Sequence, residues 1–226
     1  MNSGRADRRA LWITFEGTEG VGKTTQIERL AERLERAGRV VRITREPGGT
    51  TLGRRLRAVL LEPTERPMHT HAELLLCTAD RVQHLAEVIL PALDRGEVVL
   101  CDRFLDATLA YQGYARGLGF DAVLALHRLP PLDSRPDRTL LLDMTPERAL
   151  TRALQRNAGS GQEASEGRFE GEQLEFHERV RAGYLELARG EPGRIRVVRA
   201  DGDADDVESR IAAELADLFP ELGERT

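Results

Sequence analysis

Residues Gly17 to Thr24 read G-T-E-G-V-G-K-T, which fits the phosphate-binding pattern G-x-x-x-x-G-K-[ST]. The pattern lies between the apolar run Leu11 to Phe15 and an amphipathic segment from Thr24 to Arg36, as a strand–loop–helix arrangement requires. Glycines let such a loop curl, so that backbone amides and the positive end of the helix dipole converge on phosphate groups. We expect Lys23 to reach the β- and γ-phosphates and the Thr24 hydroxyl to be a ligand of Mg²⁺. The residues predicted to bind ATP are Gly17, Thr18, Glu19, Gly20, Val21, Gly22, Lys23, Thr24 and Thr25.

A second set of polar residues follows the next two apolar runs. Arg45 follows the run Val40 to Thr44, within the segment T-R-E-P-G-G-T, and Asp102-Arg103 follows the run Val98 to Cys101. Because α/β proteins bind ligands at the carboxyl ends of their strands, we expect these side chains to meet near the loop. Arg45 could clamp a phosphate monoester, Asp102 could hold Mg²⁺ through water, and Arg103 could bridge donor and acceptor phosphates. A lone Asp-Arg pair is more often a surface feature, but this combination favours a site for phosphoryl transfer.

The segment Asn157 to Gly171 is rich in Gly, Ser and Glu and poor in apolar residues. It is either a flexible surface loop or a mobile lid. Charge spreads over the group that moves in phosphoryl transfer, so a guanidinium on a closing lid would stabilise that charge and exclude water. We predict a lid over about 152–171, with Arg156 catalytic, Arg168 as the second choice, and Arg152 near the ATP phosphates. The alternative is that Arg156 only favours the negative end of a helix.

Five apolar runs of strand length alternate with segments of helical periodicity, which is typical of a parallel sheet covered by helices. The predicted strands are Leu11 to Phe15, Val40 to Thr44, Val98 to Cys101, Thr139 to Asp143 and Ile195 to Arg199. The predicted helices are Thr24 to Arg36, Leu52 to Leu61, Ala72 to Leu93, Phe120 to Arg128, Pro146 to Gln155, Gln173 to Ala188 and Asp205 to Leu218. The predicted fold class is α/β, a P-loop NTPase-type doubly wound sheet of about five parallel strands with flanking helices and a mobile lid. One domain is expected over 11–220, between a flexible N-terminal tail, 1–10, and a C-terminal tail, 221–226.

Composition narrows the class of protein. A chain of 226 residues can bury one good core, and its net charge of −5 comes from interspersed acids and bases, so neither a nucleic-acid polymer nor a membrane is an expected partner. No apolar run approaches the roughly 20 residues of a membrane span, and no secretion signal is expected at the start. The two cysteines, Cys77 and Cys101, fall in segments predicted to be buried. Reduced thiols and a cytoplasmic protein are therefore expected.

With these residues, the chain resembles the thymidylate kinase family from Leu11 to about Leu218. The resemblance rests on the phosphate-binding loop, the segment Thr44 to Thr50, the Asp102-Arg103 step, and Ala110-Tyr111-Gln112-Gly113 followed by Arg116-Gly117. It implies a homodimer that transfers phosphate from MgATP to the 5′-phosphate of deoxythymidylate, giving dTDP and ADP for dTTP synthesis. Because the loop contains no arginine, the chain is similar to the bacterial members that carry the catalytic arginine in the lid.

The resemblance also implies roles for single residues on the acceptor side. Arg45 and Arg103 resemble the ligands of the acceptor phosphate, and Lys23 and Arg103 are expected to act in catalysis. Arg81 resembles the residue that hydrogen-bonds the thymine carbonyl, although it could instead pair with a neighbouring acid as a solvated helix residue. Tyr111 resembles the aromatic residue that packs against the sugar and disfavours a 2′-hydroxyl.

Further expectations concern the 3′-hydroxyl and the base. Glu19 resembles the acid near the sugar 3′-hydroxyl, Thr108 is expected at the base edge, and Pro47 is expected to follow a cis peptide bond. Cys77 stands where relatives usually have a phenylalanine that stacks on thymine, and Phe104 where they often have tyrosine or histidine. The predicted substrate-binding set is Glu19, Arg45, Cys77, Arg81, Asp102, Arg103, Phe104, Thr108, Tyr111 and Gln112, with Thr24 and Asp102 at the metal.

Two alternatives stay open at this point. The acceptor could be another nucleoside monophosphate such as deoxyuridylate, which the residues at Cys77 and Phe104 would permit. The chain could also be a non-catalytic nucleotide sensor, but a guanine-reading N-K-x-D pattern is absent and the acceptor-side arginines would then be unexplained. The helix predicted over Ala72 to Leu93 is apolar on more than one face, which indicates either a dimer surface or burial beneath another helix.

Overall fold

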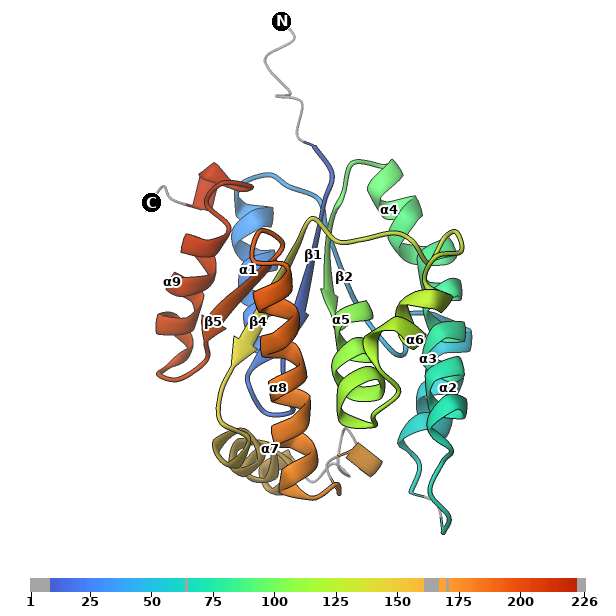
Figure 1. The fold of residues 1–226 in the computed structure, drawn as a ribbon. Coiled ribbons are helices and arrows are strands. Elements are labelled where there is room, and N and C mark those ends of the chain that lie inside the picture. Colours follow the sequence, from blue (N-terminus) through green and yellow to red (C-terminus); the bar gives the residue numbers. More distant parts are fainter. Residues whose placement is uncertain (1–8, 64, 161–166, 170, 223–226) are drawn as a thin grey trace, which may run out of the picture.

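Five parallel strands form a sheet that helices cover on both sides in the computed structural model (Figure 1). The structure describes residues 9–63, 65–160, 167–169 and 171–222, with the backbone alone for 156–160. The strands are β1 Leu11–Glu16, β2 Val41–Arg45, β3 Val98–Asp102, β4 Arg138–Asp143 and β5 Ile195–Arg199, in the order β2-β3-β1-β4-β5. All five predicted strands are confirmed, each to within one residue at either end.

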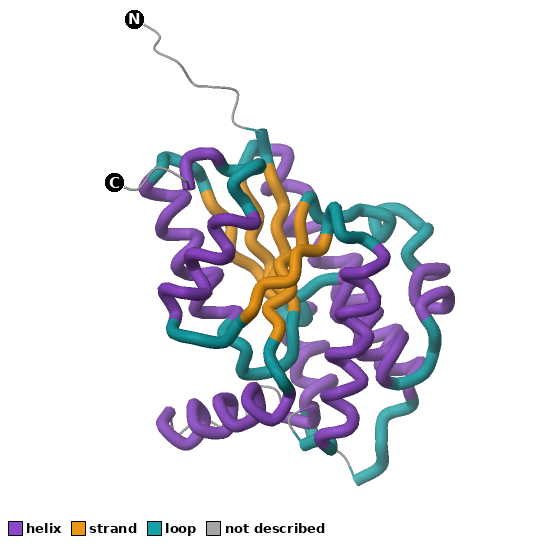
Figure 2. The backbone as a smooth tube through the Cα atoms, turned by 60° about the vertical axis from the view of Figure 1, so that its left-hand side comes forward, coloured by secondary structure: helices purple, strands orange, loops and turns teal. Residues whose placement is uncertain are grey.

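The hydrophobic core consists of two clusters, one on each face of the sheet, because side chains along each strand point alternately to the two faces. On β1, Trp12 belongs to one buried cluster, whereas Leu11 and Ile13 belong to the other, because successive strand side chains point to opposite faces. The Trp12 face packs against α3, α5, α6 and α8, and the Ile13 face packs against α1 and α9. Figure 2 shows helices on both sides of the strands. The sheet is therefore covered on both faces, as its nearly unbroken apolar runs predict.

Each predicted helix is present with at least one end shifted, and α5 is an additional helix that was not predicted. The helices are α1 Lys23–Arg36, α2 Thr51–Leu61, α3 Thr70–His84, α4 Leu90–Asp94, α5 Leu105–Thr108, α6 Phe120–Leu126, α7 Pro146–Ser160, α8 Leu174–Gly190 and α9 Ala204–Glu214, with short 3₁₀ turns at Gly167–Phe169 and Pro220–Leu222. A π-helical turn, Leu85–Ile89, joins α3 to α4, so the predicted helix Ala72 to Leu93 is one rod with a widened turn. That turn ends two residues before Pro91, which has no N–H for the usual bond four residues back. Within the described part of the chain, no helix is both long and apolar enough to span a bilayer.

Two stretches differ from the prediction. The segment after Asp102-Arg103 was expected only to carry motif residues, but α5 and the π-helical turn Leu109–Ala115 make it helical. Helix α7 was expected to end at Gln155 and continues to Ser160, so the first part of the predicted lid is helical. The rest of that lid lies outside the described residues, apart from the turn at Gly167–Phe169 and Gly171. Short helices with glycine inside them, such as the one containing Gly113, lack the length that makes periodicity visible.

Candidate active site

The phosphate-binding loop connects the middle strand, β1, to the start of α1. Gly17, Gly20 and Gly22 have φ values of 131°, 80° and 97°, a region that other residues rarely adopt. A Cβ built on Gly20 would lie 2.0 Å from the carbonyl oxygen of Ala149, so α7 packs directly on the loop. Val21 turns its side chain into the core. The loop is thus fixed from both sides, and its backbone amides are set at the helix start, where an anion binds.

A polar hollow opens above this loop. Glu19, Gly20, Gly22, Lys23, Thr24, Thr25, Arg45, Asp102, Arg103 and Arg152 line it. Lys23 Nζ lies 3.2 Å from the Gly17 carbonyl oxygen and 3.0 Å from that of Thr18, so the ammonium stays over the loop. Arg152 donates to the carbonyls of Ala200 and Gly202 at 3.2 Å and 3.3 Å. The structure therefore gathers the predicted donor-side cations around one hollow.

Asp102 provides a carboxylate that can hold a divalent cation through water. Its Oδ1 atom is buried without a hydrogen-bond partner among the described residues, and its Oδ2 lies 4.0 Å from Arg45 Nη2. The two residues are register partners at the ends of β3 and β2. No group of three or more His, Cys, Asp or Glu side chains suited to a metal occurs in the described part of the chain. One carboxylate and the Thr24 hydroxyl, completed by phosphate oxygens and water, match the way Mg²⁺ is usually bound.

Arg103 links the loop to the neighbouring pocket. Among the described residues it is the one non-glycine residue with positive φ, at 72°. Its Nη2 atom donates to Glu19 Oε1 at 2.9 Å, its Nη1 atom lies 3.3 Å from the Tyr184 hydroxyl, and its guanidinium lies 5.0 Å from the centre of the Tyr111 ring. The next amide, Phe104 N, donates to Glu16 Oε1 at 2.7 Å. A backbone of this kind persists only where surrounding contacts fix it, and here the contacts aim the guanidinium at the junction of two cavities.

Two buried glutamates beside Arg103 differ in pKa. Burial raises the pKa of Glu16 to about 8, with a further contribution from Asp106, although Tyr184 donates a hydrogen bond to it. Burial also opposes the charge of Glu19, but Arg103, His177 and Lys23 together hold its pKa well below its ordinary value. The Tyr111 hydroxyl donates to Glu19 Oε1 at 2.7 Å. Glu19 is therefore ionised, and it ties the loop to the aromatic wall of the acceptor pocket.

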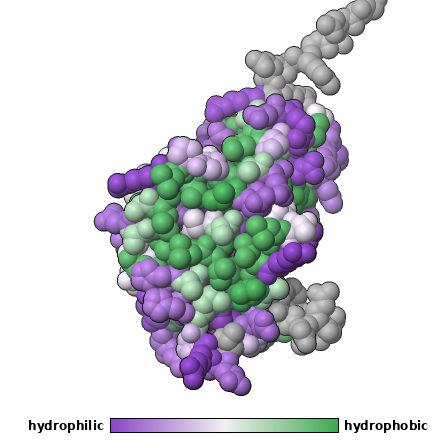
Figure 3. All heavy atoms as spheres, turned by 90° about the vertical axis from the view of Figure 1, so that its right-hand side faces the viewer, coloured by the Kyte–Doolittle hydropathy of each residue, from purple (hydrophilic) through white to green (hydrophobic). Residues whose placement is uncertain are grey.

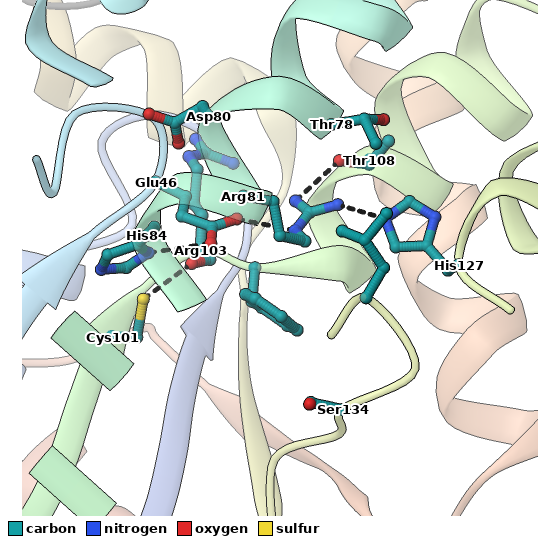
Figure 4. A network of polar contacts seen from close by, with 12 residues as sticks. Glu46, Thr78, Asp80, Arg81, His84, Cys101, Arg103, Thr108, His127 and Ser134 are labelled. Carbon is teal, nitrogen blue, oxygen red and sulfur yellow. Dashed lines mark hydrogen bonds and ion pairs between the residues drawn. The ribbon is translucent and has the colours of Figure 1, made fainter. Parts of the chain in front are cut away.

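The acceptor pocket lies beside the loop and has a mainly apolar lining. Its lining residues are Glu19, Glu46, Pro47, Leu60, Leu61, Cys77, Asp80, Arg81, Arg103, Phe104, Ala107, Thr108, Tyr111, Gln112 and Phe169. Arg81 is 2% exposed and donates to Glu46 Oε2 at 2.8 Å and Thr108 Oγ1 at 3.0 Å (Figure 4). This burial rules out the alternative of a solvated helix residue. Arg45 belongs to the hollow next to this pocket.

The two unusual residues of the predicted base site are both in this pocket. Cys77 lines it, and burial raises the pKa of its thiol to about 12, so the thiol stays neutral. Phe104 lies edge-on to Trp12, with ring centres 4.6 Å apart, and the Arg81 guanidinium lies 4.7 Å from the centre of the Phe104 ring. Phe104 therefore supports Arg81 as well as forming part of the wall.

The predicted lid arginines are placed differently from one another. The backbone of Arg156 is in α7, and its side chain is outside the described residues. Arg168 Nη2 donates to Glu73 Oε2 at 2.7 Å, and its Nε donates to the Leu60 carbonyl at 3.1 Å. Arg168 thus lies on the acceptor side and does not line the hollow over the loop. Its catalytic role stays a prediction, as does that of Arg156.

Sequence reasoning did not select several residues that the structure brings to the site. Phe169 lines the pocket and lies edge-on to Tyr111, with ring centres 5.6 Å apart. Glu46 anchors Arg81 from the loop after β2, where the predicted cis bond before Pro47 is present. The motif around Glu46 could have suggested it. No local signal identifies Phe169, because its role depends on contact with distant helices.

This arrangement is that of a P-loop kinase, with an ATP hollow at the loop and a neighbouring pocket for a small phosphorylated acceptor. Comparison with known proteins supports the same class and narrows it. The family model described as "Thymidylate kinase" matches residues 15–211, and the chain therefore belongs to the thymidylate kinase family. A protein named thymidylate kinase from Syntrophotalea carbinolica is 57% identical over 203 residues, which cover 89% of this chain and 93% of that protein. Another from Desulfosudis oleivorans is 51% identical, with 91% and 96% covered.

A solved structure agrees with this family. The crystal structure of thymidylate kinase from Ehrlichia chaffeensis matches with a TM-score of 0.73 and 31% identity, covering 92% of this chain and 99% of that one. The alternative reading as a nucleotide sensor is therefore not favoured. The predicted fold class and family are confirmed.

Proposed function

We propose that this chain transfers the γ-phosphoryl group of ATP to the 5′-phosphate of deoxythymidylate, giving ADP and dTDP. One observation carries the proposal: the Arg103 guanidinium contacts Glu19 of the phosphate-binding loop and the Tyr111 ring of the acceptor pocket. A cation in that place faces both the donor and the acceptor phosphate. Membership of the thymidylate kinase family supports the choice of acceptor.

The donor side binds ATP through the loop amides and Lys23. The ammonium of Lys23 stabilises charge on the β- and γ-phosphates, and Arg152 provides a further cation on the rim of the hollow. Thr24 and Asp102 would hold Mg²⁺, the first directly and the second through water. When bound with ATP, the ion would supply positive charge that offsets the negative charge developing during transfer.

The acceptor side positions an already ionised nucleophile. A phosphate monoester needs no general base at neutral pH, so catalysis consists of alignment and charge stabilisation. Arg45 and Arg103 bind the acceptor phosphate, Arg81 faces the base, and Tyr111 packs on the sugar. The acceptor oxygen forms a bond to the γ-phosphorus while the bond to the β–γ bridging oxygen breaks, and ADP leaves with that oxygen.

The lid completes the site in this proposal. Arg156 reaches the γ-phosphate when the segment after α7 closes, and closure excludes the water that would hydrolyse ATP. Arg168 holds the far end of the segment through Glu73. Its pairing with a buried carboxylate supports a role in ordering the lid.

The test is a direct assay of the purified protein. MgATP is mixed with each nucleoside monophosphate in turn, ADP is measured by a coupled reaction, and the diphosphate product is identified by mass. A strong preference for deoxythymidylate is expected. Equal turnover of deoxyuridylate or another monophosphate would exclude the proposed acceptor, and ATP binding without transfer would exclude the reaction.

We further propose a homodimer built on α2 and α3. Apolar side chains are exposed along α3 at spacings of three and four, from Ala72 and Leu75 through Ala79 to Val82, and Leu75 is 57% exposed. Leu52 and Val59 are exposed on the adjacent helix α2. Figure 3 shows a broad apolar area on the side of the molecule where these helices lie. Light scattering of the purified protein should give twice the chain mass.

The expected compartment is the cytoplasm. Both substrates are intracellular nucleotides, and Cys77 and Cys101 are free thiols. Cell fractionation should recover the activity with the soluble enzymes.

A further inference from the structure

His127 is a buried histidine that contacts the predicted base reader. It is 1% exposed, directly after the end of α6, and no motif in the sequence selects it. Its Nε2 atom lies 2.9 Å from Arg81 Nη1 (Figure 4). Its Nδ1 atom lies 2.8 Å from the carbonyl oxygen of Val123. The ring therefore connects the last turn of α6 to the guanidinium in the acceptor pocket.

The neighbours of His127 fix its proton. A carbonyl oxygen only accepts and a guanidinium only donates, so Nδ1 carries the hydrogen and Nε2 offers its lone pair to Arg81. Burial and the charge of Arg81 lower the pKa of His127 to about 4. The imidazole is thus a neutral acceptor at the pH at which a kinase works.

The Arg81 guanidinium needs this acceptor because only one carboxylate oxygen of Glu46 accepts a hydrogen bond from it. One oxygen of Glu46 accepts from Arg81 Nε, whereas the other lies 2.9 Å from His84 Nδ1. The carboxylate therefore does not form the bidentate ion pair that could by itself fix the orientation of the guanidinium. The two terminal nitrogens of the guanidinium are positioned separately, Nη1 by His127 and Nη2 by Thr108.

The guanidinium has five N–H groups, of which these contacts use three. Its face lies against the Phe104 ring, so rotation out of this plane is also restricted. Nη1 and Nη2 each keep one further N–H, and Arg81 lines the acceptor pocket. A donor-only group fixed at the pocket wall suits a base with a carbonyl at that edge and disfavours a base with an amino group there.

We propose that His127 is a positioning residue that sets base selectivity: it holds Arg81 so that the remaining N–H groups face the carbonyl of the pyrimidine base. The inference rests on the proposed function, because it assumes that Arg81 reads the base of the acceptor. It adds a residue from the end of α6, which is not among the segments that line the acceptor pocket.

Two substitutions separate positioning from packing. His127→Leu fills similar space without an acceptor, whereas His127→Gln can place an amide oxygen near the position of Nε2. For His127→Leu we expect the KM for deoxythymidylate to rise about 10- to 100-fold, the range for a lost hydrogen bond to a charged group. The preference for deoxythymidylate over deoxycytidylate, measured as the ratio of kcat/KM values, should fall about 10-fold or more. The KM for ATP should stay within about twofold, because the donor hollow is untouched.

His127→Gln should keep the KM for deoxythymidylate within about threefold of the wild type, since the amide restores the acceptor. His71→Leu, at an exposed position early in α3, is the matched control and should change neither constant. Thermal unfolding of each variant shows whether it is folded. If His127→Leu does not fold, His127→Phe, the nearest ring without an acceptor, replaces it.

The possible outcomes distinguish failure of the positioning role of His127 from failure of the proposed function. An unchanged base preference in folded His127→Leu would overturn the positioning role, as would equal losses in His127→Leu and His127→Gln or a parallel rise in the KM for ATP. A wild-type protein that does not phosphorylate deoxythymidylate would instead refute the proposed function.

Discussion

At the scale of single residues, the carboxylate of Asp102 offers the clearest separation of function from stability. Its Oδ1 atom is buried and has no hydrogen-bond partner among the described residues, so the fold gains little from its charge. A buried polar atom without a partner costs free energy unless a ligand satisfies it. An unpartnered oxygen of this kind is what a residue that binds a ligand in the hollow would show.

Asp102→Asn should lower kcat about 10- to 100-fold and raise the Mg²⁺ concentration needed for half-maximal rate, because a group that holds the ion through water loses its charge. The free energy of unfolding should stay the same or increase. Rates measured over a Mg²⁺ titration and urea unfolding test both parts. Asp121→Asn, at an exposed position in α6, is the control, and a variant with wild-type Mg²⁺ dependence would remove Asp102 from the metal site.

Glu16 differs from Asp102, because the burial of its carboxyl group makes the stability of the folded protein depend on pH. Its pKa in the folded protein is about 8, above the ordinary value of 4.5. Between these two values the folded state keeps a proton that the unfolded state has lost, so the free energy of unfolding decreases as pH rises through this window. Glu16→Gln should flatten this decrease between pH 5 and 8.

Urea unfolding of both proteins at several pH values measures the difference. Asp80, whose pKa burial raises to about 6, contributes equally in both proteins and cancels in the comparison. Parallel curves for the two proteins would show that Glu16 is ionised throughout. The same carboxylate accepts a hydrogen bond from Phe104 N at 2.7 Å, which the amide oxygen of glutamine can also accept.

At the scale of elements, the short turn Gly167–Phe169, near the C-terminal end of the predicted lid, forms part of the wall of the acceptor pocket. Arg168 is paired with Glu73 on α3, and the Phe169 ring packs edge-on against Tyr111. The turn is thus bound to the acceptor side by contacts that include this ion pair, this aromatic contact and a hydrogen bond from Arg168 Nε to the Leu60 carbonyl oxygen. The turn therefore borders the acceptor pocket and not the hollow over the phosphate-binding loop.

Phe169→Ala should raise the KM for deoxythymidylate about 10-fold, because an aromatic wall and its contact with Tyr111 are lost. The KM for ATP should change little. Steady-state kinetics with each substrate varied in turn provide the measurement. Leu154→Ala, at a side chain 67% exposed on α7, is the matched control, and equal effects of the two variants would argue against a closing role for Phe169.

At the scale of the whole molecule, the apolar side formed by α2 and α3 is the feature that a monomer does not explain. Leu75 and Val82 are exposed on the same face of α3. The buried face of this helix, which carries Leu74, packs into the core. Exposed apolar patches of this kind usually mark an interface. A second copy of the chain is the occupant we propose.

Leu75→Glu should weaken the dimer about 100-fold or more, because a charge would be buried without a partner at the interface. Sedimentation velocity over a range of concentrations measures the shift to monomer. Val197→Glu places the same charge on an exposed residue of β5, on an edge strand at the opposite side of the sheet, and should leave the dimer intact. A wild-type protein that is monomeric at all concentrations would refute the dimer itself.

The sequence by itself determined the five strands, the phosphate-binding loop and the two strand-end motifs. Each of these depends on local chemistry: apolar runs of strand length, glycines that allow positive φ, and polar residues immediately after a strand. It also indicated the family through Thr44 to Thr50 and Asp102-Arg103. It did not reveal the helix after Phe104 or the true end of α7, because short or polar helices carry little periodicity.

Only the tertiary structure decided which distant residues meet. Arg81 is buried because Glu46, Thr108 and His127 converge on it from three separate segments, and no spacing along the chain encodes that meeting. Phe169 reaches the acceptor pocket for the same reason. Local patterns determine elements, whereas the contacts that tune a site form only when the elements pack, so pairings across the fold had to be observed in three dimensions.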